Sequence, residues 1–222
     1  MKSNREYRRS AYELVKNKVF DIFVPLIVFS FVTGIISSVG TSFGPTYQTD
    51  TFPPVVLDPG NPTLLSIFNF LSFLIAAYVS YSVLVMFIEV AKDNRPNIED
   101  VLLVGVKEQP IKSPILVLVV SVFTGLWTFL FIIPGIVKAY AYSLSMYVLI
   151  QNKDIKIIDA IRESEVLMKG KKMQLFLLDL SYVGWYLLSL LTLGILLIWV
   201  VPRHQTARTL FFIDAYQSAE AR

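Results

Sequence analysis

Five ionisable residues stand inside otherwise apolar stretches of the sequence and are the candidates for chemistry. They are Lys138, Asp179, Arg203, His204 and Arg208. A charge at the centre of a membrane costs roughly 2.5–3.5 kcal/mol by insertion scales, so such side chains face protein or water rather than lipid. Two interpretations stay open. They are polar contacts that hold helices together, which we favour, and a polar site for a substrate, an ion or a lipid headgroup.

The positions of these residues suggest specific partners. Asp179 and Arg208 lie toward the same end of two adjacent antiparallel helices, which predicts a buried ion pair between them. Lys138 follows Pro134 and Gly135, which we interpret as a break near the outer membrane surface. We therefore expect the long side chain of Lys138 to extend to the lipid headgroups.

Metal, thiol and common hydrolase chemistry find no basis in the sequence. His204 is the only histidine and there is no cysteine, which excludes a His-rich metal site, disulfides and thiol catalysis. The motifs HExxH, GxSxG and GxxxxGK(S/T) are absent. Glu163 and Glu165 are two residues apart and so lie on different faces of a helix. We predict a protein that is not an enzyme and needs no cofactor, and a proton-handling role for His204 would require contact with water.

The distribution of charge indicates an integral membrane protein. Residues 19–91 contain no Lys or Arg, and the chain is 55% hydrophobic with 17% charged residues. Soluble domains are about 25% charged, and the mean hydropathy here is +0.60. The basic residues form short clusters beside apolar runs, which is typical of topology signals and of contacts with anionic lipids. They do not form the continuous basic face that nucleic-acid binding needs.

Apolar runs of about twenty residues predict the membrane spans. The two longest runs exceed one span each and are expected to break at Pro134-Gly135 and at Thr192-Leu193-Gly194. An even number of spans puts both termini on the same side, and the charge bias makes that side cytoplasmic. The chain is then one polytopic domain, 1–222, with an extracellular loop at 40–63 and spans at about 19–39, 64–91, 114–133, 136–150, 174–193 and 195–214.

Each pair of spans follows a short amphipathic segment, at 7–15, 98–106 and 157–168. Apolar and charged residues in these segments alternate with a helical period, which is typical of helices that lie along the headgroups. The predicted fold is an all-α membrane protein with six transmembrane helices in three hairpins, each preceded by an interfacial helix. The alternative is that any six-span chain with short loops shows this pattern.

The C-terminal half resembles a known family. The residues that carry the resemblance occur in a fixed order: Ile132-Ile133-Pro134-Gly135, Asp159-Ala160-Ile161-Arg162-Glu163-Ser164, Met168-Lys169-Gly170-Lys171-Lys172, Asp179-Leu180-Ser181, Gly184-Trp185, Leu191-Thr192-Leu193-Gly194-Ile195, Trp199 and Pro202. Together they are similar to the bacterial integral-membrane family numbered 975 among domains of unknown function. The resemblance implies a six-span plasma-membrane protein and no particular activity. Arg203 departs from the aromatic residue common at that position in the family. The layout is also loosely similar to the membrane portion of some glycerophosphodiester phosphodiesterases, and no catalytic residue carries over.

These observations predict a non-enzymatic, multi-pass bacterial plasma-membrane protein with both termini in the cytoplasm. We expect a lipid- or protein-binding scaffold, accessory or immunity protein, with anionic headgroups, a protein partner or a second copy as partners and no nucleic acid. The alternative is a small transporter or channel with a polar path near Asp179, Arg203 and His204.

Overall fold

The computed structural model describes residues 1–48, 53–96 and 98–220. Within these ranges the chain is helical apart from one two-stranded sheet, which confirms the predicted all-α class in outline. Residues 49–52 of the predicted 40–63 loop lie outside the described part.

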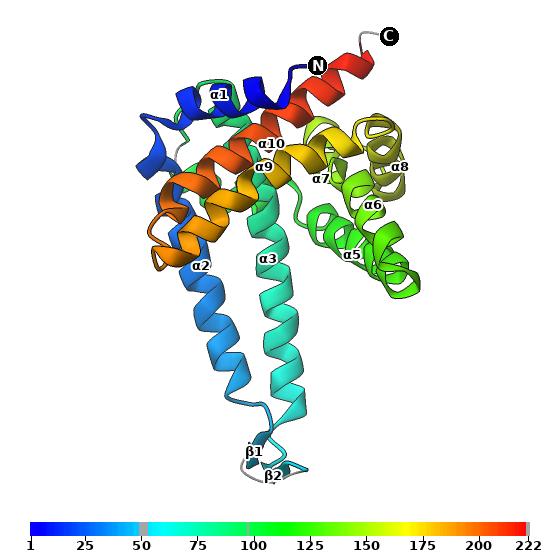
Figure 1. Cartoon of the computed structure of the whole chain (residues 1–222). Helices are drawn as coiled ribbons and strands as arrows, with labels where there is room; N and C mark the ends of the chain where they lie inside the picture. Colours follow the sequence, from blue (N-terminus) through cyan, green and yellow to red (C-terminus); the bar gives the residue numbers. More distant parts are fainter. Residues whose placement is uncertain (49–52, 97, 221–222) are drawn as a thin grey trace.

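A long antiparallel hairpin of two helices is the tallest feature of the molecule (Figure 1). It pairs α2, Val19–Thr41, with α3, Pro62–Ala91. The connection at its far end forms a small antiparallel sheet from β1, Thr46–Gln48, and β2, Val55–Asp58. Asn61 caps α3 by accepting a hydrogen bond from the backbone N–H of Leu64. At about 1.5 Å per residue both helices are long enough to cross a membrane.

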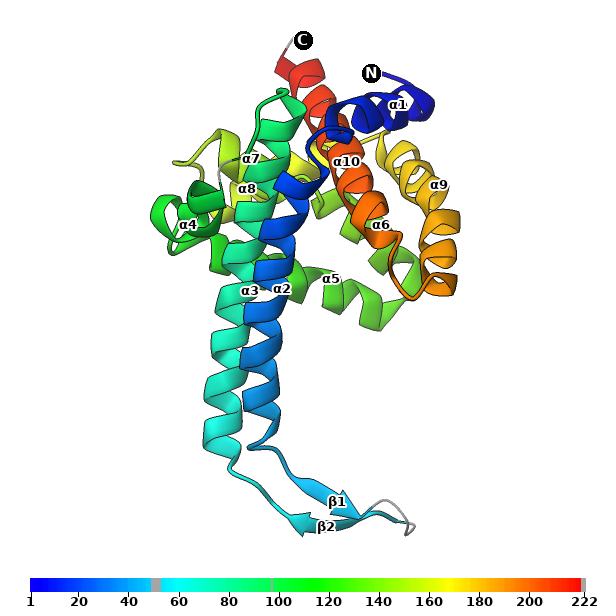
Figure 2. The same cartoon turned by 90° about the vertical axis from the view of Figure 1, so that its left-hand side faces the viewer.

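All other helices gather at the opposite end of that hairpin, together with both termini (Figures 1 and 2). They form two shorter hairpins, α5–α6 and α9–α10, with α1, α4, α7 and α8 around them. The bounds are Asn4–Val15 for α1, Ile98–Glu108 for α4, Lys112–Leu130 for α5, Ile132–Tyr142 for α6, Ser145–Gln151 for α7, Ile157–Leu167 for α8, Lys172–Leu191 for α9 and Leu197–Glu220 for α10.

The three predicted amphipathic segments are helices: α1, α4 and α8. A capping box starts α1, in which the Ser3 hydroxyl accepts from the backbone of Glu6 and the Glu6 carboxylate accepts from the backbone of Ser3. Tyr7, Ala11 and Val15 recur at helical spacing and are buried, so α1 lies with one face on the helices beneath it.

Five segments of the described residues are long and apolar enough to cross a membrane: Val19–Thr41, Pro62–Ala91, Lys112–Leu130, Ile132–Gln151 and Lys172–Leu191. The predicted sixth span, 195–214, falls in α10 and is not among them. Its low hydropathy has a clear cause, because Arg203, His204, Arg208 and Asp214 all lie within it.

Two predicted helix breaks had different outcomes. The break at Thr192-Leu193-Gly194 is confirmed, with Leu193 and Gly194 at φ values of 51° and 86°. The break predicted at Pro134-Gly135 is wrong in position, because the chain turns at Phe131. Pro134 then lies in the first turn of α6, where a missing N–H costs nothing. Gly135 allows close packing, since a Cβ there would lie 2.6 Å from Thr128 Cα.

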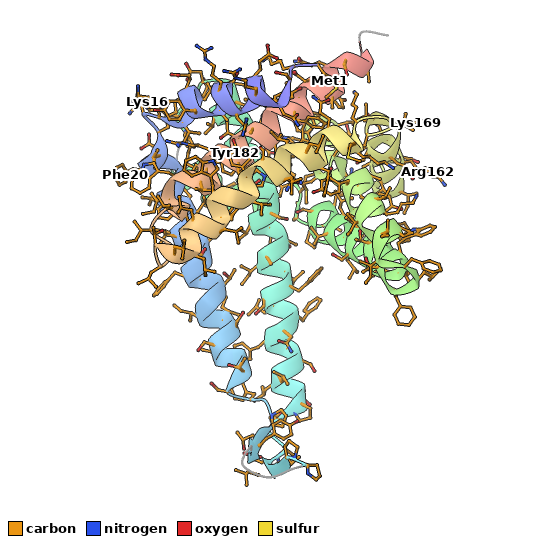
Figure 3. All side chains as sticks on the ribbon, viewed as in Figure 1. Met1, Lys16, Phe20, Arg162, Lys169 and Tyr182 are labelled. Atoms are coloured by element: carbon orange, nitrogen blue, oxygen red, sulfur yellow. The ribbon has the colours of Figure 1, made fainter. Side chains whose placement is uncertain are left out.

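Most of the buried side chains of the described residues lie at the crowded end of the molecule. Tyr7, Phe211 and Leu178 belong to a core in which each is fully buried. Figure 3 shows Lys16, Arg162 and Lys169 at that same end. Along the lower part of α2 and α3 the side chains are mostly exposed, and Phe43 stacks on Phe68 with ring centroids 5.3 Å apart. This arrangement fits a protein whose lower half is surrounded by lipid tails.

Candidate functional site

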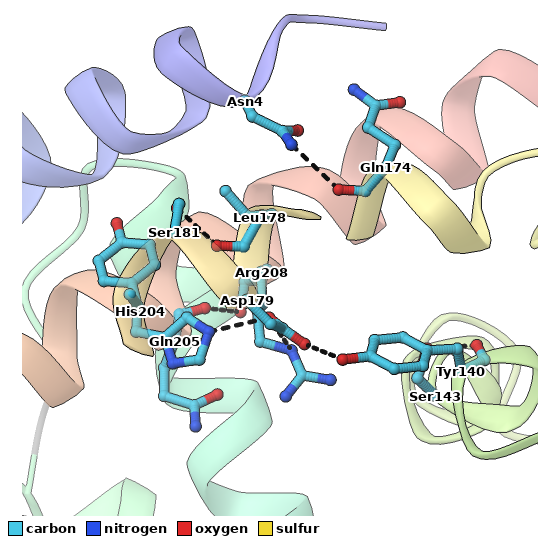
Figure 4. Close-up of polar contacts among 12 residues, drawn as sticks. Asn4, Tyr140, Ser143, Gln174, Leu178, Asp179, Ser181, His204, Gln205 and Arg208 are labelled. Carbon is cyan, nitrogen blue, oxygen red and sulfur yellow. Dashed lines mark hydrogen bonds and ion pairs between the residues drawn. The ribbon is translucent and has the colours of Figure 1, made fainter. Parts of the chain in front are cut away.

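Asp179 on α9 is the centre of a buried polar network (Figure 4). Its Oδ1 lies 2.8 Å from Nε2 of His204 and 3.6 Å from Nε of Arg208, both on α10. The hydroxyl of Tyr140, on α6, donates to Oδ2 at 3.1 Å. The Asp179 side chain is only 17% exposed. The carboxylate therefore joins three helices through charge and hydrogen bonds rather than through apolar contact.

His204 extends this network on its other side. Its Nδ1 lies 2.9 Å from the hydroxyl of Tyr186, and its ring stacks on Tyr182 with centroids 4.6 Å apart. The carboxylate of Asp179 only accepts hydrogen bonds, which assigns the proton to Nε2 and lets Nδ1 accept from Tyr186. Both ring nitrogens are satisfied by this tautomer.

The predicted site residues separate into three locations. Asp179 and Arg208 form the predicted ion pair, and His204 joins it. Lys138 lies elsewhere: its ammonium pairs with Glu165 on α8 and sits 5.2 Å from the ring centroid of Trp127. That contact differs from the expected extension toward outer headgroups, because α8 belongs to the crowded end of the molecule.

Sequence reasoning missed the tyrosines of the network. Tyr182 and Tyr186 follow Asp179 at the i+3 and i+7 positions of α9, so all three lie on one helix face. That spacing was a usable signal. Tyr140 had no comparable signal, because it comes from a helix 39 residues away in sequence.

The Tyr140→Phe variant tests the link between α6 and the network. A hydrogen bond to a charged group contributes roughly 1.5–3 kcal/mol, so the free energy of unfolding should fall by about 2 kcal/mol. The measurement is denaturant unfolding of the purified chain in detergent. Tyr47→Phe in the exposed strand β1 is the matched control and should change little. Equal stability of the two variants would contradict the assigned bond.

A second site lies between α1 and the α9–α10 hairpin. Arg203, the last of the predicted site residues, lines this second site. Its guanidinium lies 4.5 Å from the ring centroid of Tyr12 on α1. The pocket holds about 440 Å³, within the usual range of ligand sites, about 300–1,000 Å³. It is lined by Arg5, Arg8, Arg9, Tyr12, Tyr182, Trp185, Leu196, Trp199, Val200 and Arg203.

The positions on α1 explain why its arginines share this pocket. Arg5, Arg8, Arg9 and Tyr12 recur every three or four residues, so they lie along one face of the helix. Tyr7 fixes the rotation of α1: its ring packs edge-on against Phe211, and its hydroxyl donates to Asp214 at 2.9 Å. Burial, followed by the hydrogen bond to Asp214, raises the pKa of Tyr7 above its ordinary value.

The positive charge of the pocket is not compensated within the described residues. None of its four arginines forms a salt bridge there. The Nε of Arg203 is also buried without a hydrogen-bond partner in that part of the chain. Guanidinium groups in this state recognise phosphate or carboxylate oxygens. The tryptophans beside them are typical of the headgroup level of a membrane.

Residues 131–218 match the family described as Protein of unknown function (DUF975). This match includes α9, nearly all of α10 and the whole polar network, and it leaves out α1, which supplies three arginines of the pocket. No curated protein and no solved structure matches the chain. The looser similarity to the membrane portion of glycerophosphodiester phosphodiesterases has no support in these comparisons.

Proposed function

We propose that this protein is a non-enzymatic, multi-pass scaffold of the bacterial plasma membrane that binds an anionic phospholipid at its cytoplasmic face. The observation that carries the proposal is the group of four arginines that form no salt bridge with any described residue and line one pocket with two tryptophans. The arginines fit a phosphate headgroup, and the apolar lining fits the upper acyl chains.

The location of this pocket supports the proposed orientation. It lies at the end of the molecule that holds both termini, where Figure 3 also shows Lys16, Arg162 and Lys169. Basic residues are retained on the cytoplasmic side of bacterial membranes and are attracted there by anionic lipids. An accessory or immunity role would then use this lipid-anchored end to hold a protein partner or a second copy.

The alternative, a transporter or channel with a path along Asp179, Arg203 and His204, has less support. Asp179 and His204 are bonded to each other, and their side chains are only 17% and 11% exposed. Arg203 faces the pocket under α1 instead of the network. We therefore assign the network a structural role and the pocket the binding role.

Lipid titration of the purified full chain tests this proposal. The Arg5→Gln/Arg8→Gln variant removes two exposed arginines from the pocket wall without disturbing the core. Near a membrane surface each arginine contributes about 1 kcal/mol to anionic-lipid binding, so the double variant should bind phosphatidylglycerol roughly 30-fold more weakly. Native mass spectrometry of protein released from nanodiscs gives the bound lipid.

The matched control removes two exposed charges from the region of α8, as Arg162→Gln/Lys169→Gln. It should keep the affinity of the unmodified chain, because neither residue lines the pocket. If both double variants bound phosphatidylglycerol equally weakly, the binding would depend on the general surface charge. That result would overturn the assigned site. Equal binding of phosphatidylcholine and phosphatidylglycerol by the unmodified chain would do the same.

A further inference from the structure

The turns of the two shorter hairpins differ sharply in composition from the connection of the long one. Between α2 and α3 the connection mixes apolar residues with polar ones and contains the charged Asp58. At the α5–α6 turn, by contrast, five consecutive apolar side chains are at least 60% exposed: Phe129, Leu130, Phe131, Ile132 and Ile133. At the α9–α10 turn the same is true of Leu190, Leu191, Leu193 and Ile195, which are 62–94% exposed.

Several hydrogen-bond donors at the two turns are bonded within the turns themselves. The backbone N–H of Phe131 donates to the carbonyl of Trp127 at 3.0 Å, and that of Gly194 donates to Ser189 at 2.8 Å. The hydroxyl of Thr192 donates to the carbonyl of Ser189 at 3.1 Å. Such internal bonding is what a turn needs in order to lie in hydrocarbon, where water cannot complete its hydrogen bonds.

Both turns end well short of the β1–β2 end of the molecule. Figures 1 and 2 differ by a turn about the vertical axis, so heights can be compared between them. In both views the α5–α6 and α9–α10 turns lie beside the middle of α2–α3. Figure 2 also shows α5 strongly inclined to α3, which explains how a helix of 19 residues covers only part of the depth.

The charged residues nearest each turn give an independent measure of depth. Lys138 is six residues after Ile132, about 9 Å along α6, and it already pairs with Glu165 of α8. Arg203 is ten residues after Leu193, about 15 Å along the chain, and it lines the arginine pocket. A complete crossing needs about 30 Å of hydrocarbon, so each returning segment reaches polar surroundings in about half that depth or less.

We infer that α5–α6 and α9–α10 are re-entrant hairpins, which enter from the cytoplasmic side, place their apolar turns among the acyl chains near the bilayer centre, and return. Only α2–α3 then crosses the membrane. The chain then has two crossings instead of the six expected in the sequence analysis, and its termini remain together on the cytoplasmic side. The occupants of the exposed apolar surface are the lipid tails of the cytoplasmic leaflet.

Site-directed spin labelling tests this topology, because the chain has no native cysteine to remove. Ile133→Cys and Leu193→Cys place a nitroxide at the two turns. Thr46→Cys marks the outer connection, Lys169→Cys the cytoplasmic side, and Phe70→Cys the interior of α3, eight residues from Pro62. The labelled full chain is reconstituted in vesicles, and collisions with oxygen and with a water-soluble nickel chelate report depth.

The expected result is that the labels at 133 and 193 collide with oxygen and not with the chelate, as the label at 70 does. Collision with the chelate at the level seen for 46 would mean that the turns reach the outer surface, and would overturn the inference. Protection from both reagents would mean contact with protein and would also overturn it. Anionic-lipid binding is not an input to this test, so its outcome is independent of the proposed function.

Discussion

The Asp179→Ala variant is expected to lose about 3–5 kcal/mol of its free energy of unfolding, because removing one partner of a buried charge pair leaves the other without compensation. Here Arg208 loses its carboxylate, and His204 and Tyr140 each lose a hydrogen-bond acceptor. The Arg208 side chain is only 28% exposed, so water replaces the carboxylate poorly. Unfolding of the purified chain in mixed detergent, followed by circular dichroism, gives the difference.

One further variant shows how much of this loss depends on the charge of Asp179, and a second variant serves as an exposed control. Asp179→Asn keeps an acceptor for Tyr140 and removes the charge, so its loss should be intermediate. Asp159 is an exposed residue of α8 whose Oδ1 lies 3.8 Å from Nη1 of Arg162. Asp159→Ala should change the free energy of unfolding by less than about 0.5 kcal/mol. If Asp179→Ala were as mild as Asp159→Ala, the network would not be holding the three helices.

The second large effect is expected from Gly135→Ala, a change of one methyl group. The new Cβ would lie 2.3 Å from Oγ1 and 2.6 Å from Cα of Thr128, and the backbone atom cannot rotate away. Overpacking of this kind typically costs roughly 1–3 kcal/mol, and we expect the upper part of that range because α5 must move. The same unfolding measurement applies.

Gly125→Ala is the matched control, since it lies on α5 in the same hairpin and a Cβ there would meet no described atom within 4 Å. Alanine favours helix over glycine by up to about 1 kcal/mol, so this variant should be unchanged or more stable. Adding Thr128→Ala to Gly135→Ala removes only the Oγ1 contact and should restore part of the loss. Equal stability of the two glycine variants would show that the helices are not in close contact there.

Hydropathy and charge distribution were sufficient to predict the helical class and the positions of α2 and α3. They were also sufficient to predict the α9–α10 break, because Gly194 adopts the positive φ that its residue type suggests. The α5–α6 break was misplaced because proline was interpreted as ending a helix. Pro134 instead stands in the first turn of the next one.

The remaining differences come from contacts that sequence periodicity does not record. The partner of Lys138 is Glu165, 27 residues away, and nothing local to Lys138 points to it. Counting apolar residues measures the length of a helix and says nothing about its inclination, so hydropathy alone does not separate a full crossing by α5 or α9 from the re-entrant path inferred above. The basic clusters were interpreted as topology signals and as contacts with anionic lipids, but the convergence of the α1 arginines on Arg203 depends on how α1 packs against α10.

The packing of α1 on α10 also sets the order in which this protein is completed during synthesis. Tyr7 and Asp214 are 207 residues apart in sequence, so their hydrogen bond joins the first helix made to the last. At roughly 5–20 residues per second, α1 exists for about 10–40 s before its partner leaves the ribosome. During that time the face of α1 that packs on α10 in the finished protein has no partner. Its basic face can bind the anionic membrane surface in the meantime. The arginine pocket is therefore the last part of the molecule to form, and a chain that stops before α10 keeps the α2–α3 hairpin without ever acquiring the site.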